Sequence, residues 1–314
     1  MSGKQKSTKI LLLVLALLLV LVAVNQVSKS KKGERTFRNE LISATPDEVT
    51  SLSLWLRSSG FSEVKLTRQG DDWVMKHEGV NYRADGDLVN GMIDELLTVK
   101  PERLVARTRE AWGEYDVTDS TGIRVVLNSD KKRLGEIYIG RFGFNQATRK
   151  PTTYVRMEGD KETYAVEAYL SMTFSRDVEG LRDKSIFRGN RVDITSVTFH
   201  MPGDSSFTLQ RDVNRWNING IPADSAATIN YLNSIAYTVG TQFRDDFAPG
   251  VFTGDTYKMV IDQLNLPPVE ILAWVDEYGT ILQSTANPDA FFDSGTANLF
   301  GKLFKGPGHF MAKE

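Results

Sequence analysis

Glu48-Val49-Thr50-Ser51-Leu52-Ser53-Leu54 and Asp193-Ile194-Thr195-Ser196-Val197-Thr198-Phe199 are the stretches that decide the fold, because every position is identical or chemically close. Such self-similarity indicates an internal repeat. In both copies apolar and polar residues alternate, which is typical of a half-buried strand. Thr45-Pro46-Asp47-Glu48 alone has the form of a helix start with a capping box, but the alternation in two copies outweighs it. The sequence therefore predicts strands over 49–56 and 194–201.

The correspondence continues in the same order along the chain. Further matched pairs are Leu66-x-Arg68-x4-Trp73 with Leu209-x-Arg211-x4-Trp216, and Ala84-Asp85 with Ala223-Asp224. The separation between copies drifts from 145 to 139 residues, which small loop insertions and deletions explain. Because Trp73 and Trp216 occupy equivalent positions, we expect both to be buried core anchors rather than a ligand platform.

Each copy continues with two more strands, a helix and further strands. In the first copy we expect strands over 64–68, 73–77, 123–127, 136–139, 153–157 and 163–166, and helices from Asp87 and over 168–178. In the second we expect strands over 207–211, 216–219, 257–262, 269–275 and 280–284, a helix capped by Asp224, and an element over 298–304. On this interpretation the second unit has lost at least one strand.

These patterns predict an α+β fold: two tandem related units of antiparallel sheet with packed helices, after one N-terminal transmembrane helix. The expected boundaries are a basic N-terminus over 1–9, a signal anchor over 10–27, a linker over 28–45, a first repeat unit over 46–185 and a shortened second unit over 186–314.

The N-terminal apolar run, Ile10–Val24, contains only Ile, Leu, Val and Ala. As a helix it spans about 22 Å, and extension to Val27 gives about 27 Å, against a hydrocarbon core of about 30 Å. We expect an uncleaved membrane anchor, with a cleaved secretory signal as the alternative. Five basic residues follow the run and three precede it, which on charge alone favours a cytoplasmic domain. We nevertheless expect an exported domain, because a short basic start before one apolar segment is the usual export signal.

Composition excludes several classes of protein. The chain has no cysteine, which excludes a disulfide scaffold, a thiol nucleophile and an acylated lipoprotein. Its formal net charge of −2 gives no reason to expect nucleic-acid binding.

The sequence also lacks a nucleophile elbow, a metalloprotease motif and a phosphate-binding loop. The three histidines are far apart, and Gly140-Arg141-Phe142-Gly143 is interpreted as a loop. The paired carboxylates Asp71-Asp72 and Asp245-Asp246 are expected to face water in turns. We therefore expect no catalytic residue, cofactor or metal.

Four residues are candidate partner contacts. Phe142, Phe144 and Arg149 lie in the predicted loop over 141–151, and Trp112 lies near Tyr115 in another predicted loop. A protein-binding patch needs apolar or aromatic surface with a polar rim, which this loop offers. The alternative is merely a long hairpin loop.

Three short motifs, with the basic start and single span, carry a family resemblance: Tyr138-Ile139-Gly140, Tyr154-Val155-Arg156 and Leu181-Arg182-Asp183-Lys184. The chain resembles an uncharacterised family of membrane-anchored envelope proteins, described only as a domain of unknown function. Its members are commonly encoded beside ABC exporter genes of the gliding-motility type. The resemblance implies a non-enzymatic accessory component that is tethered by a single pass to the bacterial inner membrane, with its large domain in the periplasm. Its implied partner is an ABC transporter permease or another envelope protein. An independent glycan- or peptide-binding scaffold, or an unrecognised hydrolase, are the alternatives.

Overall fold

The computed structural model describes residues 38–146, 149–203, 205–213 and 215–311. The predicted membrane anchor over 10–27 and the basic start over 1–9 lie outside these residues. The chain divides into two compact units. Of the described residues, the first unit contains those up to Val80 and those within Asp87–Leu181, and the second contains Asn81–Gly86 and those from Arg182 onward.

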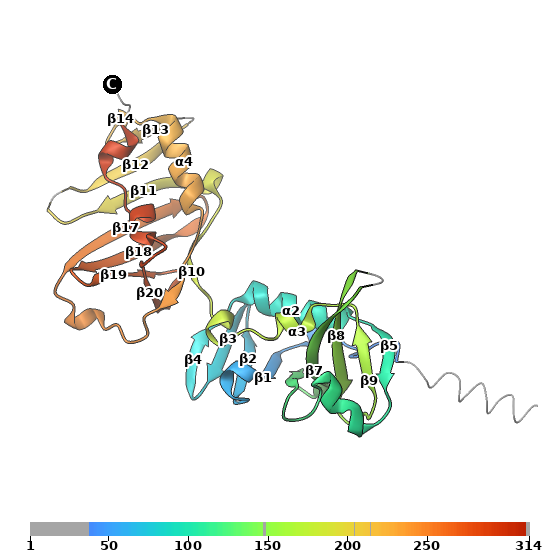
Figure 1. Ribbon diagram of the computed structural model, residues 1–314. Coiled ribbons are helices and arrows are strands. Elements are labelled where there is room, and N and C mark those ends of the chain that lie inside the picture. The colour runs from blue at the N-terminus through green and yellow to red at the C-terminus, as the bar shows by residue number, and fades with distance from the viewer. Residues whose placement is uncertain (1–37, 147–148, 204, 214, 312–314) are drawn as a thin grey trace, which may run out of the picture. The chain divides into compact units, whose positions relative to one another are not determined.

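The first unit is built on a nine-stranded sheet (Figure 1), although residues 81–83 of its edge strand are counted with the second unit in the division above. Its strands are β1 (Ser51–Trp55), β2 (Glu63–Gln69), β3 (Asp72–His77), β4 (Val80–Arg83), β5 (Pro101–Ala106), β6 (Ile123–Asn128), β7 (Arg133–Asn145), β8 (Lys150–Met157) and β9 (Thr163–Val166). The order across the sheet is β4-β3-β2-β1-β6-β7-β8-β9-β5. Neighbouring strands pair antiparallel, as in β1–β2, β1–β6 and β7–β8.

The second unit repeats this arrangement with its own nine strands. They are β11 (Ile194–His200), β12 (Phe207–Asp212), β13 (Arg215–Ile218), β14 (Ile221–Pro222), β16 (Gln242–Phe243), β17 (Asp255–Gln263), β18 (Leu266–Asp276), β19 (Gly279–Ser284) and β20 (Asn287–Asp293). Their order is β14-β13-β12-β11-β17-β18-β19-β20-β16, the same as in the first unit. A separate two-stranded sheet joins β10 (Ser185–Arg188) to β15 (Tyr237–Val239). The prediction that the second unit had lost a strand is wrong, because β20 was not recognised in the sequence.

The two predicted tryptophan anchors are buried, with Trp73 1% and Trp216 8% exposed. Each lies opposite an arginine across a hairpin, Arg68 in the first unit and Arg211 in the second. The matched register explains the repeated Arg-x4-Trp spacing. It also confirms that these indoles belong to the cores.

One helix follows the first hairpins of each unit: α2 (Gly86–Thr98) and α4 (Ser225–Ile235). The side chain of Asp224 accepts a hydrogen bond from Ala227 N at 2.8 Å, so its predicted capping role is confirmed. Asp87 is not a cap, because α2 already begins at Gly86 and places Asp87 in its first turn. Both helices bury one face, as an amphipathic helix on a sheet must.

Three local expectations need correction. The helix predicted over 168–178 is only α3 (Leu170–Thr173), because the amide of Ser175 bonds the carbonyl of Met172 in a tight closing turn. Gly140-Arg141-Phe142-Gly143 is not a loop but part of β7, and the predicted loop over 141–151 is mostly strand. A register shift between Ile139 and Phe142 interrupts the alternation of buried and exposed residues along β7. For this reason the sequence pattern predicted only the first part of the strand.

The element over 298–304 is the short helix α5 (Leu299–Leu303). It follows β20 as α3 follows β9, so the two units also share this feature. Within the part of the chain that the structure describes, we find no helix with the length and apolar character needed to cross a membrane.

A candidate partner-binding surface

Two predicted contact residues, Phe142 and Phe144, lie near the end of β7. They are 41% and 55% exposed, and they face Thr153 and Pro151 across the β7–β8 hairpin. The ring of Phe142 stacks on that of Tyr169, with centroids 6.2 Å apart and planes inclined by 12°. The hairpin and the segment after β9 therefore form one aromatic surface.

The short helix α3 supplies the other half of this surface. Leu170 and Phe174 are fully buried and four residues apart, so they fix α3 to the core. Tyr169 and Met172 are then turned outward and are 51% and 56% exposed. We name Phe142, Phe144, Tyr169 and Met172 the aromatic surface; exposed apolar groups that gather in this way commonly mark interaction sites.

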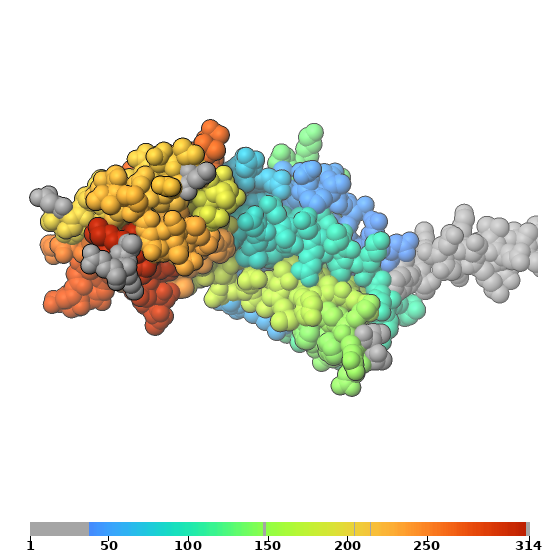
Figure 2. Space-filling model, turned by 90° about the horizontal axis from the view of Figure 1, so that it is seen from above, coloured from blue at the N-terminus to red at the C-terminus, as the bar shows by residue number. Residues whose placement is uncertain are grey.

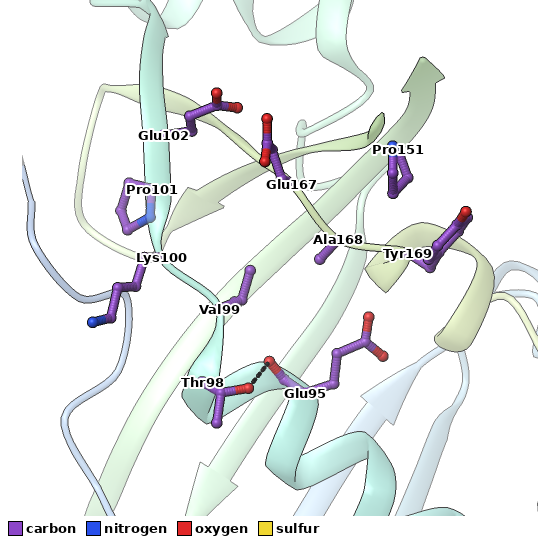
Figure 3. A pocket seen from close by; sticks show the side chains of 10 residues that line it. All are labelled: Glu95, Thr98, Val99, Lys100, Pro101, Glu102, Pro151, Glu167, Ala168 and Tyr169. Carbon is purple, nitrogen blue, oxygen red and sulfur yellow. Dashed lines mark hydrogen bonds between the residues drawn. The ribbon is translucent and has the colours of Figure 1, made fainter. Parts of the chain in front are cut away.

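A pocket of about 640 Å³ adjoins the aromatic surface (Figure 3). It is lined by the end of α2, the start of β5, the start of β8 and the residues after β9: Glu95, Thr98, Val99, Lys100, Pro101, Glu102, Pro151, Glu167, Ala168 and Tyr169. Tyr169 belongs to both the pocket and the aromatic surface. In Figure 2 the teal residues of α2 and the yellow-green residues around α3 lie side by side on one face of the first unit. A hydrogen bond of 2.8 Å from Thr173 Oγ1 to Glu95 Oε2 joins these two helices.

Two carboxyl groups meet at one end of the pocket. Glu102 is exposed, and its pKa is raised, first by partial desolvation in the pocket and then by the hydrogen bond and negative charge of Glu167. The pKa of Glu167 is lowered, chiefly because Lys150 donates a hydrogen bond to it. Adjacent carboxylates resist ionising together, and Lys150 balances the charge of only one of the two.

The other two candidate contacts lie in a turn and in a 3-10 helix. Arg149 is exposed in the turn between β7 and β8, with a φ of 56°. Trp112 is half-buried in the 3-10 helix over 109–115 rather than in an open loop, and its Nε1 donates to Lys161 O at 2.9 Å. Its ring is 3.9 Å from the guanidinium of Arg156, so Trp112 packs against the protein's own cation.

Arg156, at the end of a motif that carried the family resemblance, has a buried role that the sequence did not indicate. Only 2% of its side chain is exposed, and its guanidinium lies between Trp112 and Tyr138, 3.8 Å from the tyrosine ring. Its Nε donates to Val117 O at 2.9 Å, and its Nη2 donates to Asp119 Oδ1 at 2.6 Å. This arginine ties β8 to β7 and to the segment before β6.

Gly140, in the Tyr138-Ile139-Gly140 motif, allows the backbone around Tyr115, before β6, to approach β7 closely. A Cβ atom at this position would lie 2.0 Å from the carbonyl oxygen of Tyr115. Only glycine fits such a close backbone approach.

The carboxylate pairs in the sequence are held in surface ion pairs and turns. In the second unit the guanidinium of Arg182 binds both oxygens of Asp245 at 2.7 Å, and Arg244 binds Asp246 at 3.0 Å. Asp71 lies in the β2–β3 turn, and Asp72 is the first residue of β3 rather than a turn residue as expected. Over residues 38–311, apart from the undescribed positions 147–148, 204 and 214, no group of three or more His, Asp or Glu residues is arranged to hold a metal ion.

Comparison with known proteins finds no matching curated protein and no matching solved structure. Residues 73–245 match a family described as "Domain of unknown function (DUF4340)". The matched region begins in β3 of the first unit and ends just after β16 of the second. It covers more than half of the 314 residues, so this chain belongs to the DUF4340 family.

Proposed function

We propose that this protein is a membrane-tethered, non-enzymatic accessory component of an ABC-type transport system, with its two units in the periplasm at the bacterial inner membrane. The observation that carries a contact role is the aromatic surface, in which four large apolar side chains remain between 41% and 56% exposed. The family resemblance supports the transport partner, and the apolar run Ile10–Val24 supports the tether.

The energetics of the aromatic surface fit a tethered protein. Covering the exposed halves of its four side chains contributes roughly 1 kcal/mol each. Association in solution costs about 4–15 kcal/mol, so this surface alone supports only weak binding. A tether that confines both partners to one membrane raises the effective concentration to about the millimolar range, where weak contacts suffice.

The paired carboxylates of the second unit form ion pairs within that unit. Asp245 and Asp246 serve as partners of Arg182 and Arg244. The negative charges of these two carboxylates are therefore balanced by arginines of the same unit. The acidic pair Glu102 and Glu167 lies instead beside the aromatic surface, where it provides the polar rim of a binding site.

The test is the double variant Phe142→Ser with Phe144→Ser in the full-length, membrane-bound protein. We expect loss of crosslinking to the exporter permease in native membranes, with unchanged folding and unchanged membrane level. The matched control is Val251→Ser with Leu264→Ser, which removes two other exposed apolar side chains, 80% and 55% exposed. Retained crosslinking in the Phe double variant, or equal loss in the control, would contradict the proposed contact.

A second candidate function, an independent envelope scaffold that binds peptide, is favoured by the pocket of about 640 Å³ beside Tyr169. Retention of the protein on peptidoglycan or envelope peptides in membranes that lack the permease would select it. A hydrolase built on the Glu102–Glu167 pair would be selected by turnover that the single variant Glu102→Gln abolishes.

A further inference from the structure

The pocket beside the aromatic surface combines apolar walls with an acidic end. In Figure 3 the carboxyl groups of Glu102 and Glu167 lie close together at one end, and Glu95 lies on the opposite side. Val99 and Ala168 lie between them, and the ring of Tyr169 forms one wall. An elongated side chain with an apolar stem and a polar head would match this distribution.

The charges of the pocket favour a cationic head. Three carboxyl groups line it against one ammonium group, that of Lys100. Lys150 lies just outside the lining and pairs with Glu167. The neighbouring carboxylate of Glu167 contributes to the raised pKa of Glu102, so a cation placed between the two carboxyls would relieve their repulsion.

The apolar part of the pocket favours the same guest. The face of an aromatic ring attracts ammonium and guanidinium groups, and Tyr169 is already fixed by stacking on Phe142. Lysine and arginine bury their methylene stems along apolar surface while keeping the charged head among polar groups. An anionic guest would be repelled, and a purely apolar guest would strip water from the carboxylates without replacing their hydrogen bonds.

We propose that this pocket accepts a lysine or arginine side chain of a partner segment whose flanking apolar residues cover the aromatic surface. The proposal rests on the contact role proposed above and specifies its chemistry. The pocket is continuous with the aromatic surface, because Tyr169 belongs to both and Pro151 of the pocket pairs with Phe144. The basic and apolar residues must therefore be close together in the partner segment.

The test uses the full chain in lipid nanodiscs and two fluorescein-labelled peptides, acetyl-Phe-Lys-Phe and acetyl-Phe-norleucine-Phe. Norleucine keeps the length of the lysine stem and removes its charge. We expect the lysine peptide to bind roughly tenfold more tightly in fluorescence anisotropy, since charge-assisted hydrogen bonds form only with that peptide. Empty nanodiscs provide the background for partition into lipid.

The double variant Glu102→Gln with Glu167→Gln should bring the two affinities together, whereas Glu114→Gln, an exposed carboxyl on the 3-10 helix over 109–115, should leave the ratio unchanged. If the double variant does not fold, the single variant Glu102→Gln and a loss of the ratio at high salt provide the same test. Equal affinities on the wild-type protein, or no binding of either peptide, would overturn the inference.

These outcomes separate the inference from the proposed function. If Phe142→Ser weakens both peptides equally while their affinities on the wild type are the same, the contact role stands and the basic-residue pocket falls. If the lysine preference depends on Glu102 and Glu167 but the permease does not crosslink, the pocket stands and the transport role falls.

Discussion

Arg156 and Asp119 form one ion pair, yet we expect their removal to have very unequal effects on stability. The side chain of Arg156 is 2% exposed and that of Asp119 is 76% exposed. The arginine is held between two aromatic rings 3.9 Å and 3.8 Å from its guanidinium carbon, and it satisfies the carbonyl of the fully buried Val117. Most of its stabilising contacts therefore do not involve Asp119.

The magnitudes follow from these contacts. Removing Arg156 loses two desolvated cation–π contacts, of order 1–2 kcal/mol each, and leaves a buried carbonyl without its donor, which costs about 1–3 kcal/mol. We expect Arg156→Ala to destabilise the first unit by about 3–5 kcal/mol, as breaking other buried charge networks does. Asp119→Ala should cost only about 0.2–1 kcal/mol, as for an exposed ion pair.

Native-state hydrogen exchange with mass spectrometry measures this, because peptides report each unit separately. Protection should fall in β6–β9 of Arg156→Ala and stay unchanged in β17–β20. Arg109→Ala is the matched control, since Arg109 is exposed and 5.3 Å from the same Trp112 ring. If Arg156→Ala and Asp119→Ala differ by less than about 1 kcal/mol, the reasoning about the aromatic sandwich is refuted.

The remaining predictions concern the repeat, the topology and pH. Trp73→Ala and Trp216→Ala should each destabilise their own unit by about 3–5 kcal/mol, measured by urea unfolding; a change below about 1 kcal/mol would contradict a core role. Alkaline phosphatase fused to the C-terminus should be active in cells, whereas activity of a cytoplasmic reporter instead would favour the opposite orientation. Because Glu102 has a raised pKa in the fold, its neutral form is favoured, and the associated stability is present at low pH and lost as pH rises through that pKa. Glu102→Gln should therefore match the wild-type melting temperature near pH 4 and exceed it near pH 8; equal differences at both would refute this.

The repeat was predictable because it depends on local spacing. Arg68 and Trp73 are joined by a short hairpin turn, so their separation in sequence fixes their register across the hairpin, and the same holds for Arg211 and Trp216. The Thr45–Glu48 stretch likewise contains a capping box, and the structure uses it for a single 3-10 turn before β1. The capping-box signal was correct for residues 45–48, and the alternation found in both copies was correct for the strand at 51–55.

The sequence did not predict β20, the strand that was missed in the second unit. Asn287-Pro288-Asp289 opens β20 with residues that are typical of turns. Pairing with β19 and β16 makes this segment a strand nonetheless. Tertiary contacts here outweigh local propensity.

By itself the sequence determined the duplication, the antiparallel strands of each hairpin and the buried tryptophans, because all of these follow from periodicity and spacing over a few residues. It also placed Phe142 and Phe144 among the candidate contacts. Only the tertiary structure brought Tyr169 against Phe142, Glu102 against Glu167, and Arg156 between Trp112 and Tyr138. These partners come from strands and helices that are distant in sequence, and the order of strands across a sheet is fixed by packing of the whole unit rather than by any local pattern.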